Sequence, residues 1–138
     1  MRDVINKLLS LSLLILALQA STAYAIDDCS KGKIDPKVYA CADKNRIEAE
    51  ADLNKEYAAT KSRVEYYLKS DQAEKKRYLD KLLAAQRAWL KYREYDCQLA
   101  GCAADEGSNP SITFTNVCIT NRNIERIKRL KKISLIAI

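Results

Sequence analysis

The chain alternates apolar and polar residues with the period of an α-helix over most of its length. Residues 39–69 contain no glycine or proline, and apolar side chains recur there at steps of four or seven residues. They are Ala42, Ala49, Leu53, Tyr57, Val64 and Leu68. Asp35 before Pro36 is typical of a helix start, because proline at the first helical position loses no hydrogen bond. The pattern predicts one helix of about 30 residues that begins at Pro36.

A second helix is predicted after Ser70, running to about Cys97. Asp71 followed by Glu74 resembles a capping box, with Asp in place of the usual Ser or Thr. The second apolar stripe consists of Tyr78, Leu82, Ala85, Trp89 and Tyr92. Because the connection between the two helices is short, we expect them to form a long antiparallel hairpin with their stripes facing each other.

A long loop and a third helix are predicted to follow. Residues 101–115 contain Gly101, Gly107, Asn109 and Pro110, which are turn-forming residue types. Beyond them, Val117, Ile124, Ile127 and Leu130 recur at helical spacing among Lys and Arg residues. The sequence therefore predicts an all-α fold, a long antiparallel helical hairpin with a third, C-terminal helix packed on it, within one domain over residues 26–138.

The first 25 residues have the pattern of a secretory signal peptide. A charged start is followed by an apolar run at residues 8–18, and Ala23, Tyr24 and Ala25 provide an A-x-A cleavage pattern. A helix over that run, at about 1.5 Å per residue, is too short to cross a hydrocarbon core of about 30 Å. We expect a soluble protein of the periplasm or the secreted fraction, with no membrane span after cleavage.

Five cysteines suit an oxidising compartment, in which two disulfides and one free thiol are expected. Local pairing joins Cys29 to Cys41 at the start of the first helix and Cys97 to Cys118 across the loop, and leaves Cys102 unpaired. A hairpin that turns near Ser70 also places Cys41 beside Cys97, so a pairing of these two is the alternative. We favour the local pairing as the disulfide framework that staples the fold.

The residue types present argue for binding rather than catalysis. The chain has no histidine, which excludes Ser-His-Asp and Cys-His catalysis and histidine metal sites. None of the cysteines is spaced as C-x-x-C, so a zinc site is not expected either. Glu48, Asp52 and Glu56 share one helical face, but Lys44 and Lys55 lie beside them, as on a solvated surface. We expect no enzyme activity, no catalytic residues, no metal and no cofactor.

Charge suggests one possible partner and argues against another. The third helix is basic and is followed by an apolar end, as in helices that lie on an anionic membrane surface, although a packed helix is the simpler reading. Nucleic acid is not expected, because the chain is exported and no aromatic residues interleave with the charges.

Two segments, bracketed by cysteines, resemble a known family. Residues 51–57 read A-D-L-N-x-x-Y and residues 85–93 read A-Q-R-A-W-L-x-Y-R; Cys41-Ala42 precedes them, and Cys97 and then Cys118 with Thr120 and Arg122 follow. This frame resembles the LprI-type lysozyme inhibitor family of small bacterial envelope proteins, over nearly all of the mature chain. The resemblance implies an all-helical domain outside the cytoplasm and, for members with an assigned role, inhibition of lysozyme. Cys102 and a loop without paired glycines depart from the family pattern.

The residues of these two segments are expected to specify the fold. In the hairpin register Asn54 is level with Gln86, and Asp52 lies near Arg87 and Trp89, so these polar groups can satisfy one another. The signature residues are Asp52, Leu53, Asn54, Tyr57, Gln86, Arg87, Trp89 and Arg93.

An inhibitor could present the predicted loop to the carboxylate-lined cleft of a lysozyme. The candidate contacts are the exposed loop residues Asp105, Glu106, Ser108 and Asn109 or, alternatively, basic groups that would pair with those carboxylates. Removal of Arg2, Lys7 and Asp3 with the signal lowers the net charge from +6 to about +5. Since common animal lysozymes are strongly basic, that charge opposes the encounter. Two functions therefore follow: a protein that binds and occludes lysozyme or, alternatively, an envelope module whose basic helix contacts anionic lipid or cell-wall polymer.

The signal peptide gives the first testable prediction. Because cleavage is expected after Ala25, the mature protein should begin at Ile26. N-terminal mass spectrometry of the envelope and secreted fractions checks this. Finding the protein in the cytoplasm with Met1 retained would contradict it.

Overall fold

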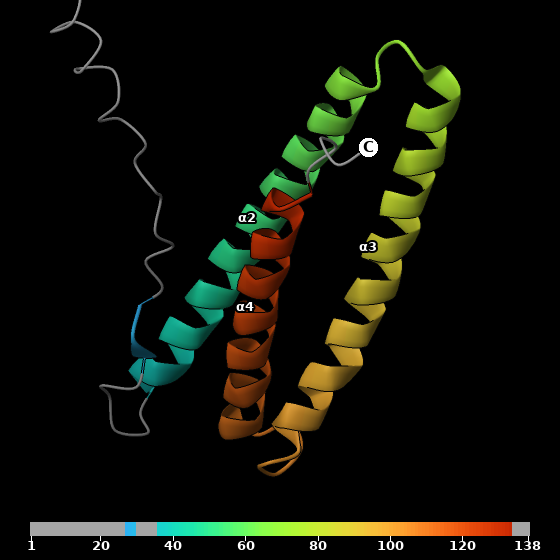
Figure 1. Ribbon diagram of the computed structural model, residues 1–138. Helices are drawn as coiled ribbons and strands as arrows, with labels where there is room; N and C mark the ends of the chain where they lie inside the picture. The colour runs from blue at the N-terminus through green and yellow to red at the C-terminus, as the bar shows by residue number, and fades with distance from the viewer. Residues whose placement is uncertain (1–26, 30–35, 134–138) are drawn as a thin grey trace, which may run out of the picture.

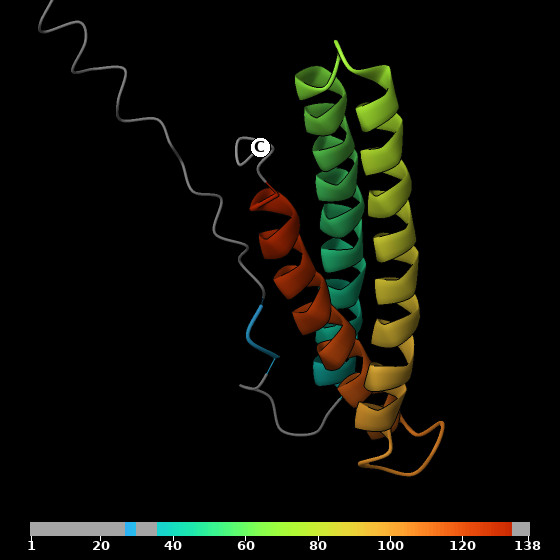
Figure 2. The same cartoon turned by 45° about the vertical axis from the view of Figure 1, so that its right-hand side comes forward.

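The computed structural model describes residues 27–29 and 36–133, and within them the chain forms three long helices and no strand. Helix α2 spans Pro36–Tyr67, α3 spans Gln72–Gly101 and α4 spans Asn109–Lys131. Figure 1 and Figure 2 show α2 and α3 running antiparallel from a tight turn, with α4 packed along both. The predicted all-α fold is confirmed. The predicted signal peptide, Asp35 and the end of the chain lie outside the described residues.

Local capping explains where the helices begin. Asp71 caps α3, because its carboxylate accepts a hydrogen bond of 2.9 Å from the backbone N–H of Glu74. The backbone N–H of Asp71 donates to the carbonyl of Leu68 at 3.1 Å, which closes the turn at residues 68–71. The predicted boundary between the first two helices is therefore correct to within a few residues.

The predicted loop over residues 101–115 was too long. Helix α3 continues to Gly101, and α4 already begins at Asn109, so the connection is residues 102–108. Ser108 caps α4 by accepting a hydrogen bond from the backbone N–H of Ser111, and Pro110 lies in its first turn. Serine, asparagine and proline also favour turns, but here they start a helix, since proline in the first turn needs no donor.

The hairpin helices are joined mainly through α4. Helix α4 contacts α2 most extensively and α3 next, whereas α2 and α3 contact each other only sparsely. The apolar core lies where the three helices meet and consists of Leu53, Leu82, Ile127 and Leu130, with Tyr57, Trp89, Leu90 and Ile133 packed against it. In this arrangement each hairpin helix directs its buried face toward α4, not toward the other hairpin helix.

This geometry corrects parts of the predicted stripes. On α3, Leu82 is buried as predicted. Tyr92 is 54% exposed and Ala85 is exposed, because the buried face continues through Gln86 and Cys97 instead. On α4, Val117 is 41% exposed, whereas Ile127 and Leu130 are fully buried as predicted. The α4 positions that complete the buried face are polar: Asn116, Thr120 and Asn123.

A hydrogen-bonded ion pair connects all three helices. Arg93 on α3 donates through Nη1 to Glu50 Oε2 on α2 at 2.7 Å and to Asn123 Oδ1 on α4 at 2.6 Å. The amide of Asn123, which is fully buried, donates to the same Glu50 oxygen at 2.9 Å. Buried polar groups need partners, so this contact favours one alignment of the three helices along their axes.

Both predicted local disulfides are present. Cys29 is bonded to Cys41 and Cys97 to Cys118, while Cys102 is free and exposed. The alternative pairing of Cys41 with Cys97 is therefore wrong. Two disulfides in a small domain indicate an oxidising compartment. Among the described helices, none is both long enough and apolar enough to span a bilayer.

Removing Asn123 tests the polar contact. Asn123→Ala leaves the Arg93 and Glu50 groups with fewer partners and should lower the free energy of unfolding by about 2 to 4 kcal/mol. Asn121→Ala is the matched control, because Asn121 is an exposed residue of the same helix, and it should change stability by less than about 0.5 kcal/mol. Urea denaturation of the oxidised protein measures both. Equal effects of the two substitutions would contradict the role given to Asn123.

Candidate functional site

A disulfide and a close contact at a glycine hold α3 and α4 together near the connection between them. The disulfide between Cys97 and Cys118 joins the two helices one turn before the connection begins. Gly101 then allows close approach, because a Cβ atom there would lie 2.5 Å from Thr115 Oγ1 and 3.3 Å from the Ser111 carbonyl oxygen. The two helices are therefore held together at the base of the loop.

The loop itself is a short turn with exposed carboxylates. The backbone N–H of Ser108 donates to the Asp105 carbonyl at 3.0 Å, and Gly107 has a φ of 74°, which favours glycine. Asp105 and Glu106 are exposed within this turn. Of the other two predicted contact residues, Ser108 is the half-buried cap of α4 and Asn109 is its exposed first residue. The acidic pair is thus the prominent chemical feature of the loop.

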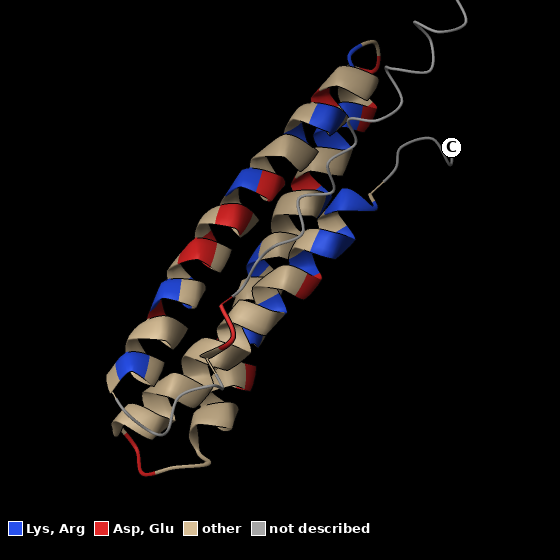
Figure 3. Ribbon diagram, turned by 90° about the vertical axis from the view of Figure 1, so that its left-hand side faces the viewer, with Lys and Arg blue, Asp and Glu red and all other residues tan. Residues whose placement is uncertain are grey.

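Charges are unevenly distributed between the two ends of the molecule. We define the loop half as the described residues on the loop side of the contact between Glu50, Arg93 and Asn123, and the turn half as those beyond it. In the loop half acidic residues outnumber basic ones, as Figure 3 shows around the loop. Its acidic residues are Asp27, Asp28, Asp43, Glu48, Glu94, Asp96, Asp105 and Glu106, and its basic residues are Lys37, Lys44, Arg46 and Arg122.

The turn half has the opposite balance, and basic residues outnumber acidic ones there. Its acidic residues are Asp52, Glu56, Glu65, Asp71, Glu74, Asp80 and Glu125. Its basic residues are Lys55, Lys61, Arg63, Lys69, Lys75, Lys76, Arg77, Lys81, Arg87, Lys91, Arg126, Lys128, Arg129, Lys131 and Lys132. Among the described residues, one end of the molecule is therefore acidic and the other basic.

Most of the signature residues contact the bundle interior. Leu53 is fully buried in the core, and Tyr57 and Trp89 pack against it. The guanidinium groups of Arg93 and Arg126 lie over the Trp89 ring, 5.4 and 5.5 Å from its centre. Trp89 thus supports two cations by cation–π contact in addition to packing on the core.

The predicted pairing of polar signature residues across the hairpin is wrong. Gln86 is buried and accepts a hydrogen bond of 3.0 Å from Arg126 Nε on α4, whereas Asn54 is exposed. Burial lowers the pKa of the Arg126 guanidinium, and nearby Arg129 lowers it further. Asp52 is half-buried and Arg87 is exposed. The hairpin register failed because α4 provides the partners that α2 and α3 were expected to give each other.

Sequence reasoning missed Glu50 and Asn123, although Asn123 is as deeply buried as the core leucines. A signal was present: Asn116, Thr120, Asn123, Ile127 and Leu130 follow one another at steps of three or four residues. Hydrophobic periodicity does not reveal this stripe, because three of its five residues are polar. Thr60 on α2 was missed for the same reason. It is fully buried, and its hydroxyl donates to the Glu56 carbonyl at 2.8 Å.

The sulfurs and most of the carboxylates that cluster among the described residues are already bonded or paired. Asp96, Cys97 and Cys118 have their ligand atoms close together, but both sulfurs belong to a disulfide and Asp96 accepts a hydrogen bond of 2.8 Å from Arg122. Two of the three carboxylates that share a face of α2 are also engaged: Glu56 pairs with Arg63 at 2.8 Å, and Glu48 lies 3.9 Å from Lys44. These groups are arranged as ion pairs on a scaffold.

Comparisons with known proteins agree with this architecture. The family model described as "Lysozyme inhibitor LprI" matches residues 27–130. An uncharacterized protein of Rhizobium meliloti (strain 1021), R02472, is 31% identical over 128 residues, which are 90% of this chain and 91% of that protein. The crystal structure of a DUF1311 family protein from Pseudomonas putida KT2440 is similar with a TM-score of 0.65 and 27% identity, covering 72% of this chain and 92% of the other. The family match spans the hairpin, both disulfides and nearly all of α4, and so the chain belongs to the LprI lysozyme inhibitor family.

Proposed function

We propose that this protein binds a lysozyme through its loop half and blocks access to the catalytic cleft. Family membership supports an inhibitor-like role, and the acidic loop half is the observation that carries the choice of surface. Lysozymes of the common animal type are strongly basic, so an acidic surface attracts them. The proposed activity is binding, with no chemical step.

A positive net charge would repel a basic lysozyme if the charge were evenly spread. It is not evenly spread, and the acidic residues predominate at the proposed contact surface. Helix α3 has 30 residues and is about 45 Å long, whereas electrostatic interactions in physiological salt are screened over about 8 Å. A partner that approaches the loop therefore interacts chiefly with the loop half. The far end of the basic turn half lies several screening lengths from the loop and contributes little repulsion.

The construction of the loop favours tight binding. Its ends are held by the disulfide between Cys97 and Cys118 and by the close packing at Gly101. A segment that is already ordered loses less conformational entropy when it binds. Asp105 and Glu106 project from this ordered turn and can pair with cationic groups around the cleft of a basic enzyme.

Charge reversal in the loop tests this proposal. Asp105→Lys with Glu106→Lys places like charges against the basic partner and should weaken inhibition at least about tenfold. Stability should change by less than about 0.5 kcal/mol, because both residues are exposed. Clearing of a cell-wall suspension by a basic animal lysozyme, followed by turbidity, measures inhibition, and thermal unfolding measures stability.

A matched control separates the loop from net charge. Glu65→Lys with Asp80→Lys makes the same change in charge at exposed positions of the turn half and should leave inhibition within about twofold of the unaltered protein. Equal weakening by both double variants would show that net charge, not the loop, matters. If an excess of unaltered protein does not slow clearing, lysozyme inhibition itself is rejected.

A second function is favoured by the basic turn half. Lys128, Arg129 and Lys132 are exposed at the end of α4 and lie on the same half as Lys75 and Lys76. Clustered Lys and Arg side chains bind anionic lipid surfaces, each contributing about 1 kcal/mol. The protein would then attach to the envelope by one end and present the other end to its partner.

Vesicle sedimentation tests this second function. The protein should sediment with vesicles that contain phosphatidylglycerol and not with vesicles of phosphatidylcholine alone. Lys128→Glu, Arg129→Glu and Lys132→Glu together should reduce sedimentation at least about tenfold, in line with the loss of three cationic contacts. The same variant should retain lysozyme inhibition. Undiminished sedimentation would exclude the end of α4 as the contact surface.

A further inference from the structure

Helix α3 has a second apolar side, which is exposed and continues onto the residue that caps its C-terminal end. The residues of this side recur at alternating steps of three and four. We name them the outer stripe: Ala85, Ala88, Tyr92, Tyr95, Leu99 and Cys102. Tyr92, Tyr95 and Leu99 are 54%, 60% and 67% exposed. No charged residue interrupts these positions over a length of about 26 Å, and exposed apolar surfaces of this kind mark contacts with other molecules.

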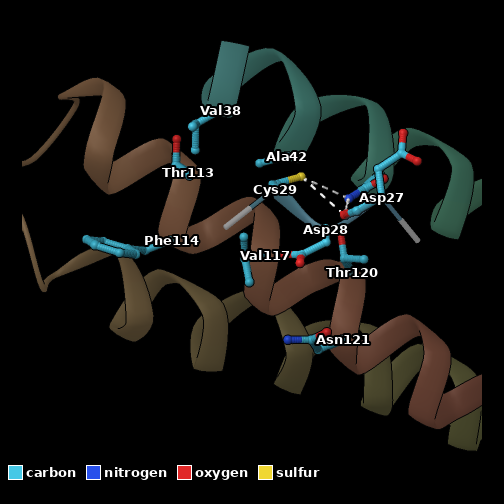
Figure 4. Close-up of a pocket in the computed structure, with 11 residues that line it drawn as sticks. Asp27, Asp28, Cys29, Val38, Ala42, Thr113, Phe114, Val117, Thr120 and Asn121 are labelled. Atoms are coloured by element: carbon cyan, nitrogen blue, oxygen red, sulfur yellow. Dashed lines mark hydrogen bonds between the residues drawn. The ribbon is translucent and has the colours of Figure 1, made fainter. Parts of the chain in front are cut away.

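The exposed sides of α2 and α4 are different in the same half of the molecule. Exposed positions of α2 include the charged residues Asp43, Lys44 and Glu48, as on a solvated surface. On α4, the exposed Phe114 and Val117 line a pocket of about 480 Å³ between α4 and α2, which Figure 4 shows. None of the outer stripe lines that pocket. The outer stripe is therefore a separate apolar surface, carried by α3 and its cap.

The spacing of the outer stripe suits contact with another helix. Its alternating steps of three and four residues give a repeat of seven, in which the stripe takes the a and d positions of a two-stranded coiled coil. The side chains at these positions fit between those of a facing helix that has the same repeat. A bilayer surface requires no such repeat. A second copy of this chain provides a helix with the matching stripe.

Charges beside the outer stripe favour a second copy in parallel orientation. When Ala85 takes an a position, Lys91 takes a g position and Asp96 the e position five residues later. In a parallel coiled coil, the g residue of one helix lies beside that e residue of the other. Lys91 is exposed, and the carboxylate of Asp96, 29% exposed, accepts a hydrogen bond from Arg122 and can accept from a second donor. Two copies can thus form this ion pair twice.

Cys102 lies at one end of the outer stripe and adds a possible covalent bond. The chain has two disulfides, whereas Cys102 is free and exposed, and such a remaining thiol in an oxidising compartment is suited to pairing between chains. The backbone of Cys102, with φ of −66° and ψ of −4°, continues the helical path of α3. Around a two-fold axis parallel to α3, equivalent positions face each other, so the thiols of two copies meet.

The size of the outer stripe explains why a covalent bond matters. Each of its two tyrosines and its leucine exposes roughly 100 Å². With the smaller residues, two copies would bury roughly 800 Å² in total, below the 1,200 Å² or so at which stable interfaces begin. The parallel arrangement also brings both acidic loops to the same end, where they repel each other. A disulfide offsets both effects, because it makes the contact between the stripes intramolecular.

We propose that the outer stripe is the interface of a parallel homodimer, in which a disulfide joins the Cys102 residues of the two copies. The bond forms by exchange with a small disulfide oxidant. The thiolate of one Cys102 attacks the oxidant and releases one small thiol, and Cys102 of the second copy then attacks the mixed disulfide and releases the other. Two protein thiols and one small disulfide thus become one protein disulfide and two small thiols. The homodimer does not depend on the proposed lysozyme inhibition.

Oxidised glutathione is the oxidant for the first test, with the mature protein at micromolar concentration. Light scattering and non-reducing electrophoresis should show a dimer, and peptide mapping should find Cys102 joined to Cys102 with both internal disulfides retained. Leu99→Lys places like charges against each other in the stripe and should lower the equilibrium constant for dimer formation at least about tenfold. Ile47→Lys is the matched control, at a 53% exposed residue of α2, and should stay within about twofold.

Two results of this test would overturn the proposal. The first is a monomer that carries only glutathione at Cys102, because the stripe then brings no second copy to the thiol. The second is a Leu99→Lys protein that dimerises as readily as the unaltered protein, because the disulfide then forms by chance collision of exposed thiols.

A displaced cysteine tests the alignment of the two copies without Cys102. In a Cys102→Ser protein, Ala88→Cys places a thiol at another d position of the outer stripe, where equivalent residues should again face each other. Arg87→Cys is the matched control, because Arg87 is the neighbouring exposed residue outside the stripe. The first variant should form a disulfide-linked dimer with glutathione at least about tenfold more readily than the second. Equal cross-linking of both variants would exclude the parallel alignment.

The same variants distinguish a second copy from other occupants of the outer stripe. Leu99→Lys should lower dimer formation, and should leave sedimentation with phosphatidylglycerol vesicles unchanged. If it lowers sedimentation while the dimer persists, a bilayer covers the stripe and the homodimer is rejected. If it abolishes lysozyme inhibition while the dimer persists, the stripe contacts the enzyme and the homodimer is likewise rejected. Absence of lysozyme inhibition in the unaltered protein would reject the proposed function and leave a dimer linked through Cys102 in place.

Discussion

The contact between Glu50, Arg93 and Asn123 is the constraint on which the rest of the structure depends. Each of the three helices contributes one polar group, and none of the three side chains is more than about a third exposed. A slide of any helix by one turn would separate a buried charge from its partners, at a cost of several kcal/mol. Apolar side chains alone tolerate such shifts better, because dispersion and burial have no direction.

The contact between Arg93 and Asn123 aligns α3 and α4 in the same way as the contacts near the connection at residues 102–108. One turn beyond Arg93 on α3 is Cys97, and one further turn is Gly101; about one turn back from Asn123 on α4 is Cys118, followed by Thr115. Three pairs of residues therefore follow a single antiparallel alignment of α3 and α4. A hydrogen bond joins Arg93 to Asn123, a disulfide joins Cys97 to Cys118, and Gly101 lies close to Thr115. That alignment brings the ends of α3 and α4 together and leaves room for only the short connection at residues 102–108. The polar contact and the loop are thus parts of one arrangement.

The fold also separates the charges of the chain. The hairpin returns α3 to the level where α2 begins, which places Asp27, Asp43, Glu94 and Asp96 in the same half of the molecule as the acidic loop. Apart from Arg122, the Lys and Arg residues of α4 lie in the other half, as does Lys69 of the 68–71 turn. A protein of this length presents different electrostatic surfaces at its two ends, since screening limits each to its own surroundings. The proposed lysozyme contact and the proposed envelope contact are compatible for this reason.

The sequence by itself determined the features that depend on neighbouring residues. Capping by Asp71, the start of α2 at Pro36, the helical character of the chain and the two disulfides, Cys29–Cys41 and Cys97–Cys118, were all predicted. The residues of the signature segments were also recognisable. Local rules failed at Ser108, Asn109 and Pro110, because the same residue types favour a turn and the first turn of a helix.

Only the tertiary structure decided which helix faces are buried and which polar residues meet. The sequence predicted that α2 and α3 pack on each other, whereas α4 takes the central place and turns Gln86, Arg93 and Asn123 inward. The separation of charge and the pocket between α2 and α4 arise from residues far apart in the chain. Hydrophobic periodicity indicates which face of a helix is buried, but not which other helix packs against it. That choice depends on long-range contacts, whose hydrogen bonds and charges are satisfied only when all three helices are assembled.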